Sequence, residues 1–326
     1  MSNLETTFAG IKLKNPIIVG SSGLTNSVEK IKDLSNKGAA AVILKSLFEE
    51  QITHEINSAI QHNGDYPGAA DYIKEYTKNH SVRNYLNLIK DAKESVEIPV
   101  IASINCQNID EWISFAKEIE TAGADALEVN AFYLALDKNR TSKQYEDPYF
   151  DLLKNLKANT KIPIIFKLGS NFTNLTGLAN RLNADGIDGI TLFNRFYEPD
   201  IDIEKLTLTT SEIFSHPSET RRIIRWLAIL SDKARGLDIS ASTGVYDAQA
   251  AIKYLLAGAT TVQLCSSIYK NGTGVIPEII NGIDQWMERK QYMHISDFRG
   301  LMSYRQIPDP TGYERAQFIR YFSNLE

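Results

Sequence analysis

Residues 238–266 read DISASTGVYDAQAAIKYLLAGATTVQLCS and contain one complete strand–helix–strand unit. A short apolar run opens the stretch, a segment of helix length follows, and the junction LAGATTVQL leads into a second apolar run. Gly258 lies in this junction, where the end of a helix favours a residue in the left-handed conformation. Short apolar runs that alternate with helical segments are typical of parallel strands buried on both faces.

The same unit recurs along the chain. Three similar junctions, NKGAAAVIL, TAGADALEV and NADGIDGIT, contain Gly38, Gly123 and Gly186. Eight strand-like runs are found in all: Pro16–Ser22, Ala41–Ser46, Pro99–Ile104, Ala126–Asn130, Pro163–Gly169, Gly189–Asn194, Asp238–Thr243 and Thr261–Ser266. They predict a (β/α)8 barrel, in which the chemistry lies at the C-terminal ends of the strands. An open, doubly wound sheet is the alternative fold.

Several segments lie outside these repeats. We expect residues 7–16 to form a hairpin at the base of the barrel, turning at Ala9–Gly10. Long segments follow the second, fourth and sixth strands and should lie over the mouth: residues 47–98, 133–147 and 196–217. In the first, HNGDYPG (62–68) predicts a loop and residues 71–94 a helix, and the second is polar and predicted to be mobile. We expect a single domain over residues 1–326, with 291–326 as an extension that packs on the barrel or forms an oligomer contact.

Composition excludes several classes of function. The 326 residues carry a net charge of −5 and an isoelectric point near 5.7, which argues against general binding to nucleic acid or anionic membranes. No apolar run approaches the ~20 residues of a membrane helix, and MSNLETTFAG does not resemble a signal peptide. The two cysteines, Cys106 and Cys265, and the five histidines show no metal-ligand spacing. The sequence therefore predicts a cytoplasmic protein that has a small-molecule substrate and no metal, nucleic-acid or membrane partner.

The strongest local signal follows the last two predicted strands. Ser242, Thr243 and Gly244 end one strand and open a helix, and Cys265 and Ser266 do the same after the next. Free backbone N–H groups at helix starts bind anions, and these two loops are the usual phosphate site of such barrels. We expect a phosphate group here, with ordinary turns as the alternative.

A second signal surrounds the rim. Lys45 and Lys167 end two otherwise apolar strands, and a lysine there should point into the mouth toward an anion or an electron-rich ring. Ser21, Ser22 and Gly23 end the first strand, where small residues leave room for a flat ligand. Asn105, Asn130 and Asn194 end three further strands, and their amides can bond a heteroaromatic ring or cap the next helix.

The chain resembles the dihydroorotate dehydrogenase family of FMN-dependent (β/α)8 barrels over nearly its whole length. The matching stretches are TTFAGIKLKNPIIVGSSG (6–23), AVILKS (41–46), IIFKLG (164–169), LFN (192–194) and ASTGVYDAQAAIKYLLAGATTVQLCSSIY (241–269). The resemblance implies FMN as cofactor. It also implies either a homodimer or a complex with an iron–sulfur flavoprotein that transfers electrons.

The resemblance implies roles for individual residues. The phosphate of FMN would bind the backbone of Thr243, Gly244, Cys265 and Ser266; Lys167 would face the pyrimidine edge of the flavin. Lys45 would contact both flavin and substrate, and Asn194 would line the substrate pocket. The full set of residues expected at the cofactor is Ser21, Ser22, Gly23, Lys45, Ser46, Asn105, Asn130, Lys167, Asn194, Ser242, Thr243, Gly244, Cys265 and Ser266.

The chain also departs from the family pattern. The family's loop after the fourth strand reads Asn-x-Ser-Cys-Pro-Asn, and we expect its catalytic base to fall on Ala131, which cannot take a proton. The substrate motif Asn-x-x-Gly-x-x-Asn is replaced by HNGDYPG, and a Gly-Gly stretch is missing near residues 211–216. Cofactor positions are thus retained while substrate positions are rewritten.

Other residues are candidates for the missing roles. The candidate proton acceptors are Glu128, Tyr133 and Cys106. The predicted catalytic set contains two of them and the two rim lysines: Lys45, Lys167, Glu128 and Tyr133. Lys45, Asn194 and Arg195 are expected at the substrate, where Arg195 would bind a carboxylate or else pair with Glu198 or Asp200.

These observations predict an FMN-dependent oxidoreductase that acts on CH–CH groups. Dihydroorotate is the family default, but we expect slow turnover of it and a different small carboxylated cyclic or unsaturated substrate. Two alternatives stay open: an aldolase-type lyase that forms a Schiff base on Lys167, and a flavin-binding protein without catalysis.

Overall fold

The computed structural model describes residues 2–48, 69–106, 109–195, 198–210 and 212–314. In this part of the chain, eight parallel strands form the barrel: β3 (Ile17–Val19), β4 (Ala41–Ile43), β6 (Val100–Cys106), β7 (Ala126–Ala131), β8 (Ile164–Leu168), β9 (Gly189–Leu192), β12 (Ile239–Ala241) and β13 (Thr261–Leu264). They pair in chain order, and β13 pairs with β3, so the sheet closes. The predicted barrel is confirmed, and the open sheet is wrong.

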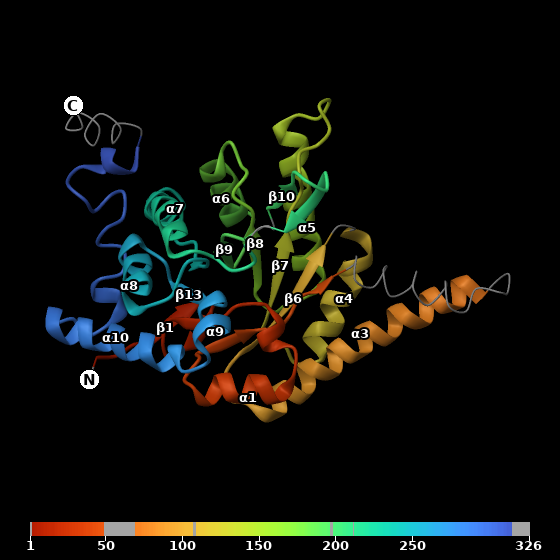
Figure 1. Ribbon diagram of the computed structural model, residues 1–326, viewed down its shortest axis with the longest axis horizontal. Helices are drawn as coiled ribbons and strands as arrows, with labels where there is room; N and C mark the ends of the chain where they lie inside the picture. Colours follow the sequence, from red (N-terminus) through yellow and green to blue (C-terminus); the bar gives the residue numbers. More distant parts are fainter. Residues whose placement is uncertain (1, 49–68, 107–108, 196–197, 211, 315–326) are drawn as a thin grey trace.

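Helices surround the strands and leave the C-terminal strand ends at the top of Figure 1. They are α1 (Val28–Asn36), α3 (Ala69–Ser95), α4 (Ile109–Thr121), α5 (Ser142–Asn159), α6 (Leu175–Ala184), α7 (Thr220–Lys233), α8 (Ala248–Ala257), α9 (Ser266–Asn271) and α10 (Val275–Lys290). Short 3₁₀ turns are η1 (Gly23–Thr25), η2 (Pro217–Glu219), η3 (Ile295–Asp297) and η4 (Pro310–Tyr313). The large apolar core lies between this helical ring and the outward side chains of the strands.

The helix-to-strand junctions have the expected geometry. Gly258 ends α8 with φ +117°, and its N–H donates to the carbonyl oxygens of Tyr254 and Leu255. A Cβ at this position would lie 2.4 Å from Cβ of Ser231, so both conformation and space require glycine. The other three junction glycines also have positive φ.

The base of the barrel is closed by the predicted hairpin. Strands β1 (Thr6–Phe8) and β2 (Ile11–Leu13) pair antiparallel around Ala9 and Gly10, both with positive φ. Phe8 is 1% exposed and packs inside the barrel with Ile18, Ile43 and Ile165. Gly189 makes room for this ring, because a Cβ there would lie 3.1 Å from it. The lower interior is therefore filled by apolar side chains, and ligands can enter only from the mouth.

The segments over the mouth match the predictions in part. The predicted helix of residues 71–94 is found as α3, while residues 62–68 lie outside the described residues. The expectation of a mobile loop over 133–147 is wrong for its second half, because α5 begins at Ser142. Thr141 and Gln144 form a capping box at its start. In the third segment, β10 (Pro199–Asp202) and β11 (Thr207–Thr210) form a hairpin that the sequence analysis did not predict.

The described part of the C-terminal extension packs on the barrel. Backbone N–H groups of Met302 and Tyr304 donate to the carbonyl oxygens of Leu256 in α8 and Ala228 in α7. Tyr292 stacks against Trp286 and Phe298. Residues 315–326 of the extension lie outside the described residues. No described helix has the length and apolar character needed to cross a bilayer.

Candidate active site

A pocket opens at the C-terminal ends of β3, β8, β9, β12 and β13. Nine predicted site residues line it: Ser21, Lys167, Asn194, Arg195, Ser242, Thr243, Gly244, Cys265 and Ser266. Gly20, Ile213, Ser215, Val245 and Gln263, which the sequence analysis did not single out, line it as well. Strands far apart in the sequence thus bring most of the predicted residues to one place.

The loops after β12 and β13 form one end of the pocket. Thr243 and Gly244 both have left-handed backbones, with φ +81° and +75°. The N–H of Gly244 donates to Oγ of Ser215 over 3.1 Å, and the N–H of Ser215 donates to Oγ of Ser266 over 3.1 Å. Tyr246 donates its hydroxyl to the Ser215 carbonyl oxygen over 2.6 Å. These bonds fix the three loops against one another.

This end of the pocket suits an anion. Cys265 precedes α9 and makes no side-chain hydrogen bond to the first N–H groups of that helix. Gly244 lets this loop pack closely against the start of α7, because a Cβ there would lie 2.9 Å from Cγ2 of Thr220. The N–H groups at the start of α9, together with the small hydroxyl residues around them, fit a phosphate group.

A polar layer lies above the apolar base of the barrel. Glu128 on β7 is fully buried, and its Oε2 accepts from Thr191 Oγ1 over 2.9 Å and from Gln263 Nε2 over 3.2 Å. Its Oε1 lies 3.9 Å from Nζ of Lys167, whose side chain is 13% exposed. Gln263 Nε2 also lies 3.1 Å from Thr191 Oγ1. Lys167 therefore stands between the pocket and a buried carboxylate.

Two buried oxygens in this layer have no hydrogen-bond donor among the described residues. They are Oε1 of Glu128 and Oε1 of Gln263. Gln263 lines the pocket, and its Oε1 lies 3.2 Å from the point where a Cβ on Gly20 would be. A buried acceptor without a donor costs free energy, so the pocket floor suits a ligand that carries an N–H group. A flavin ring has such a group beside its carbonyl oxygens, and the residues fit it.

The amides of the rim come together on one side. Asn105 is the register partner of Asn130, and Asn130 is the register partner of Lys167. Asn194 donates from Nδ2 to Oδ1 of Asn130 over 2.8 Å. Asn130 lies within β7 and caps no helix, so the capping alternative is wrong for this residue.

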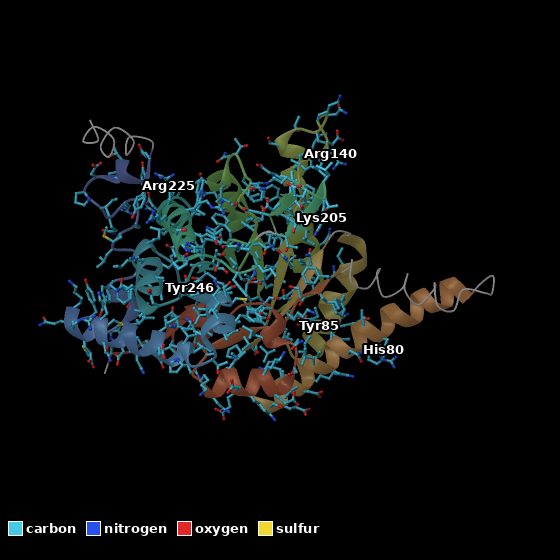
Figure 2. The ribbon with its side chains drawn as sticks, in the orientation of Figure 1. His80, Tyr85, Arg140, Lys205, Arg225 and Tyr246 are labelled. Carbon is cyan, nitrogen blue, oxygen red and sulfur yellow. The ribbon has the colours of Figure 1, made fainter. Side chains whose placement is uncertain are left out.

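Hydroxyl groups connect the ends of the first three barrel strands. Ser21 and Ser46 lie 3.0 Å apart at their Oγ atoms, and Ser46 and Ser103 lie 2.7 Å apart. The Tyr85 hydroxyl, from α3, accepts from the N–H of Ser103 and donates to its carbonyl oxygen. Ser103 lies between the β6 residues that pair with β4 and those that pair with the short strand β5 (Leu47–Phe48), and Tyr85 reaches it from α3, where Figure 2 labels it.

Lys45 does not line the pocket that Lys167 lines. It lines a neighbouring pocket with Asn26, Ser46, His80 and Asn84. Ser22 and Gly23 are likewise not lining residues of the main pocket: Ser22 caps η1 by accepting from the N–H of Leu24. Lys45 and Ser46 thus line a second cavity, whereas Ser22, Gly23, Asn105 and Asn130 line neither of the two.

The expectation that the family's base position falls on Ala131 does not agree with the geometry of β7. Ala131 is fully buried in the core between strands and helices, whereas Asn130 belongs to the rim. Counted from Asn130, the cysteine of the family's Asn-x-Ser-Cys-Pro-Asn motif falls on Tyr133. Tyr133 is half-buried, and its ring packs edge-on against Tyr149 at 5.1 Å between centroids.

Arg195 pairs with a carboxylate, but with neither of the two that we expected, Glu198 and Asp200. Its Nε lies 3.4 Å from the Glu219 carboxylate, and its Nη1 donates to the carbonyl oxygen of Ile213 over 2.8 Å. Glu219 also accepts from the N–H of His216. The pairing alternative holds, but with Glu219 rather than Glu198 or Asp200.

Cys265 is largely enclosed by the protein beside Ser22 and Lys167. Burial raises the pKa of the Cys265 thiol, while a hydrogen bond with Ser22 and the charge of Lys167 oppose that rise. The side chain of Cys106 lies outside the described residues.

The sequence contains a signal for two residues of the site that we did not predict, Gln263 and Thr191. Gln263 and Thr191 are polar residues inside the apolar strands TVQL and GITL, and a polar side chain in a buried strand needs a partner. Ser215 gave no signal, because it lies in an irregular segment.

A closed barrel with an anion cradle after its last two strands and a lysine above a polar floor is typical of enzymes that bind a phosphorylated cofactor. The chain belongs to the dihydroorotate dehydrogenase family, whose profile matches residues 3–287. Members of this family are FMN-dependent oxidoreductases that act on CH–CH groups.

Curated relatives cover nearly the whole chain. The catalytic subunit of dihydroorotate dehydrogenase B (NAD(+)) from Thermoplasma volcanium is 28% identical and covers 92% of this chain and 99% of its own length. The subunit of the same name from Caldicellulosiruptor bescii is 29% identical with the same coverage. That from Pyrococcus horikoshii is 28% identical, covering 91% of this chain and 97% of its own length.

Proposed function

We propose that this chain binds FMN in the main pocket and oxidises a CH–CH bond of a small carboxylated cyclic or unsaturated compound. The observation that carries the proposal is Lys167 above the buried Glu128, next to the anion cradle of the β12 and β13 loops. When bound, FMN accepts the hydride that leaves the substrate.

The chain's own residues hold the cofactor at two ends. The backbone around Thr243, Gly244, Cys265 and Ser266 would hold the phosphate, and the N–H of Gly244 would contribute if it released Oγ of Ser215. At the other end, the Lys167 ammonium stabilises negative charge on the ring edge, and Gln263 Oε1 offers an acceptor for a ring N–H.

Glu128 acts as a positioning residue. Its Oε2 is held by Thr191 and Gln263, so the remaining oxygen is fixed 3.9 Å from the Lys167 ammonium. A carboxylate fixed in this way orients the lysine toward the pocket and is badly placed to take a proton from a substrate. This assignment revises the role of Glu128 from proton acceptor to support for Lys167.

Tyr133 is the proposed proton acceptor, because it occupies the position of the family's cysteine after Asn130. A positioned base contributes about 10²–10⁴-fold to the rate. Tyr133→Phe removes the hydroxyl and keeps the ring contact with Tyr149, so it tests the role in proton transfer without leaving a cavity.

The substrate is proposed from the departures at the mouth. Dihydroorotate is the first compound to test, and we expect turnover well below that of relatives that carry cysteine or serine as base. Arg195 remains available for a carboxylate only if its contact with Glu219 opens. A substrate with a carboxylate is therefore expected to compete with Glu219 for this guanidinium.

We also propose a homodimer that passes electrons to a separate subunit. The relatives are named catalytic subunits of NAD(+) enzymes, which is consistent with a partner that completes the electron path to NAD⁺.

The test is anaerobic stopped-flow mixing of the FMN-reconstituted chain with dihydroorotate and other small carboxylated compounds. Rapid loss of flavin absorbance with one of them, slowed about 10²-fold or more in Tyr133→Phe, supports the proposal. Absence of flavin absorbance after incubation with excess FMN contradicts it.

Neither alternative function is favoured by the geometry. A Schiff-base lysine must be neutral, whereas Lys167 faces a buried carboxylate. Borohydride trapping of an aldehyde on Lys167 would support the lyase, and flavin that no substrate reduces would support a non-catalytic protein.

A further inference from the structure

A cavity of about 450 Å³ opens at the base of the barrel, on the side opposite the mouth. It lies where β2 and the residues that precede β4 and β6 meet α1 and the end of α3. These two helices pack against each other below the strands (Figure 1). The cavity shares no described lining residue with the pocket of Lys167 or with that of Lys45, and its size suits a small molecule.

This cavity is positively charged in a chain whose net charge is −5. It is lined by Lys12, Lys14 and Lys32, and Glu97 is the one carboxylate among its described lining residues. Three ammonium groups and one carboxylate leave a charge of +2. None of the three lysines forms an ion pair with a described residue. The cavity therefore presents positive charge that the described chain does not neutralise.

The local structure holds two of these lysines in place. Alternation along the extended chain puts Lys12 and Lys14 on one side and Leu13, which is 4% exposed, on the other, inside the barrel. Asn15 then ties this segment to the end of α1, because its Nδ2 donates to the carbonyl oxygen of Gly38 over 2.9 Å. Burial lowers the pKa of the Lys14 ammonium, which shows that it is partly withdrawn from water. An anion bound beside it would stabilise this charge.

The ends of the neighbouring helices do not account for these lysines. The C-terminal end of a helix attracts a cation. Lys37 directly follows α1, and Lys93 in the last turn of α3 pairs with Asp125 over 2.7 Å, so both helix ends already have a basic residue. Lys12 and Lys14 belong to neither helix, so we expect their counter-ion to come from a ligand.

We propose that this cavity binds a small organic phosphate that carries two negative charges and a flat ring. Lysine ammonium groups bind phosphate oxygens as point charges, and the charge of +2 matches a phosphate dianion. Val96 and Pro99 are half-buried and give the cavity an apolar wall on which a ring can pack. Ser35 and Ser95 add hydroxyl groups that can bond the polar atoms between ring and phosphate.

Adenosine monophosphate is the probe, and isothermal titration calorimetry measures its binding to the full chain that has been loaded with FMN and freed of excess. We expect one site per chain. Lys14→Gln should weaken binding at least about tenfold, because a charged hydrogen bond is lost. Glu97→Gln should tighten it at least about twofold, because the one repelling carboxylate of the cavity is removed. Adenosine, which has no phosphate, should bind at least about tenfold more weakly than the monophosphate.

Lys37→Gln is the matched control, because it removes the same charge from an exposed residue at the end of α1 that does not line the cavity. It should change the dissociation constant less than about twofold, since salt screens exposed charges. Far-UV circular dichroism and flavin absorbance check that each variant still folds and holds its cofactor.

A wild-type chain that does not bind the monophosphate at any concentration tested would overturn the inference. Equal weakening in Lys14→Gln and Lys37→Gln would also overturn it, because it would show general attraction to a basic surface. Release of FMN by the probe would place it at the mouth and have the same consequence. The inference does not depend on the flavin: a chain that takes up no FMN contradicts the proposed function, and the comparison of Lys14→Gln with Lys37→Gln still decides this one.

Discussion

The two sides of the barrel mouth are built differently. On the β12–β13 side, the backbones of Gly244 and Ser215 are fixed by hydrogen bonds between three loops. After β7 and β9, side chains predicted to meet a ligand instead contact the protein: Arg195 pairs with Glu219, and Tyr133 packs on Tyr149. The proposed cofactor end of the site therefore depends on backbone conformation, while the proposed substrate end depends on the contacts that individual side chains make.

The largest expected effect concerns Lys167, which lies between the two sides. Lys167→Met leaves the buried Glu128 carboxylate without its counter-ion, and breaking a buried pair typically costs about 3–5 kcal/mol. Urea unfolding at neutral pH measures the loss. Adding Glu128→Gln should restore most of it, because the amide oxygen can still accept from Thr191. A double variant with the same free energy of unfolding as Lys167→Met would show that the unpaired Glu128 carboxylate is not the cause of the loss.

The next effect tests the backbone argument on the cofactor side. Gly244→Ala should weaken FMN binding about 10- to 100-fold, since a left-handed alanine costs about 1–2 kcal/mol and the new Cβ meets Thr220 at 2.9 Å. Titration followed by flavin fluorescence measures it. Gly272→Ala is the control, because φ is +77° there and no atom lies within 4 Å of the added Cβ. Equal losses in both variants would contradict a specific role for the cradle.

A smaller effect is expected where α3 supports the other side. Tyr85→Phe removes the hydroxyl that satisfies the buried N–H and carbonyl groups of Ser103, which costs about 1–3 kcal/mol. Burial raises the pKa of Tyr85, so the hydroxyl remains a donor across the physiological range. Denaturant unfolding measures the change. Tyr145→Phe, at an exposed hydroxyl that accepts from the N–H of Asp137, should have little effect.

The smallest effect is a pH dependence at Cys265. Burial raises the pKa of this thiol, so at a given pH it holds less thiolate than a free cysteine and should alkylate more slowly. The rate should increase with pH beyond the range of an ordinary thiol. Mass spectrometry of the Cys265 peptide after iodoacetamide treatment measures it, with the urea-unfolded chain as reference. Lys167→Met should slow the reaction further, because the lysine charge lowers this pKa. A rate equal to that of the unfolded chain would contradict the burial of the thiol.

The sequence by itself determined the barrel and the position of the loops after β12 and β13 at its mouth. Eight apolar runs with helical segments between them allow few packings, and Gly258 and Gly244 lie where only left-handed backbone fits. These features depend on residues close together in the chain, so their pattern is readable without a structure. The hairpin at the base was readable for the same reason.

Only the tertiary structure decided which side chains meet. Gln263 and Glu128 are 135 positions apart, and closure of the barrel brings their side chains together beneath Lys167. Side chains alternate along β7, so Ala131 faces the outer core and Asn130 faces the inside of the barrel. Arg195 pairs with Glu219, which belongs to η2 and follows it in the chain by 24 residues. Contacts of this kind depend on strand register and on competition among distant partners, neither of which a local pattern records.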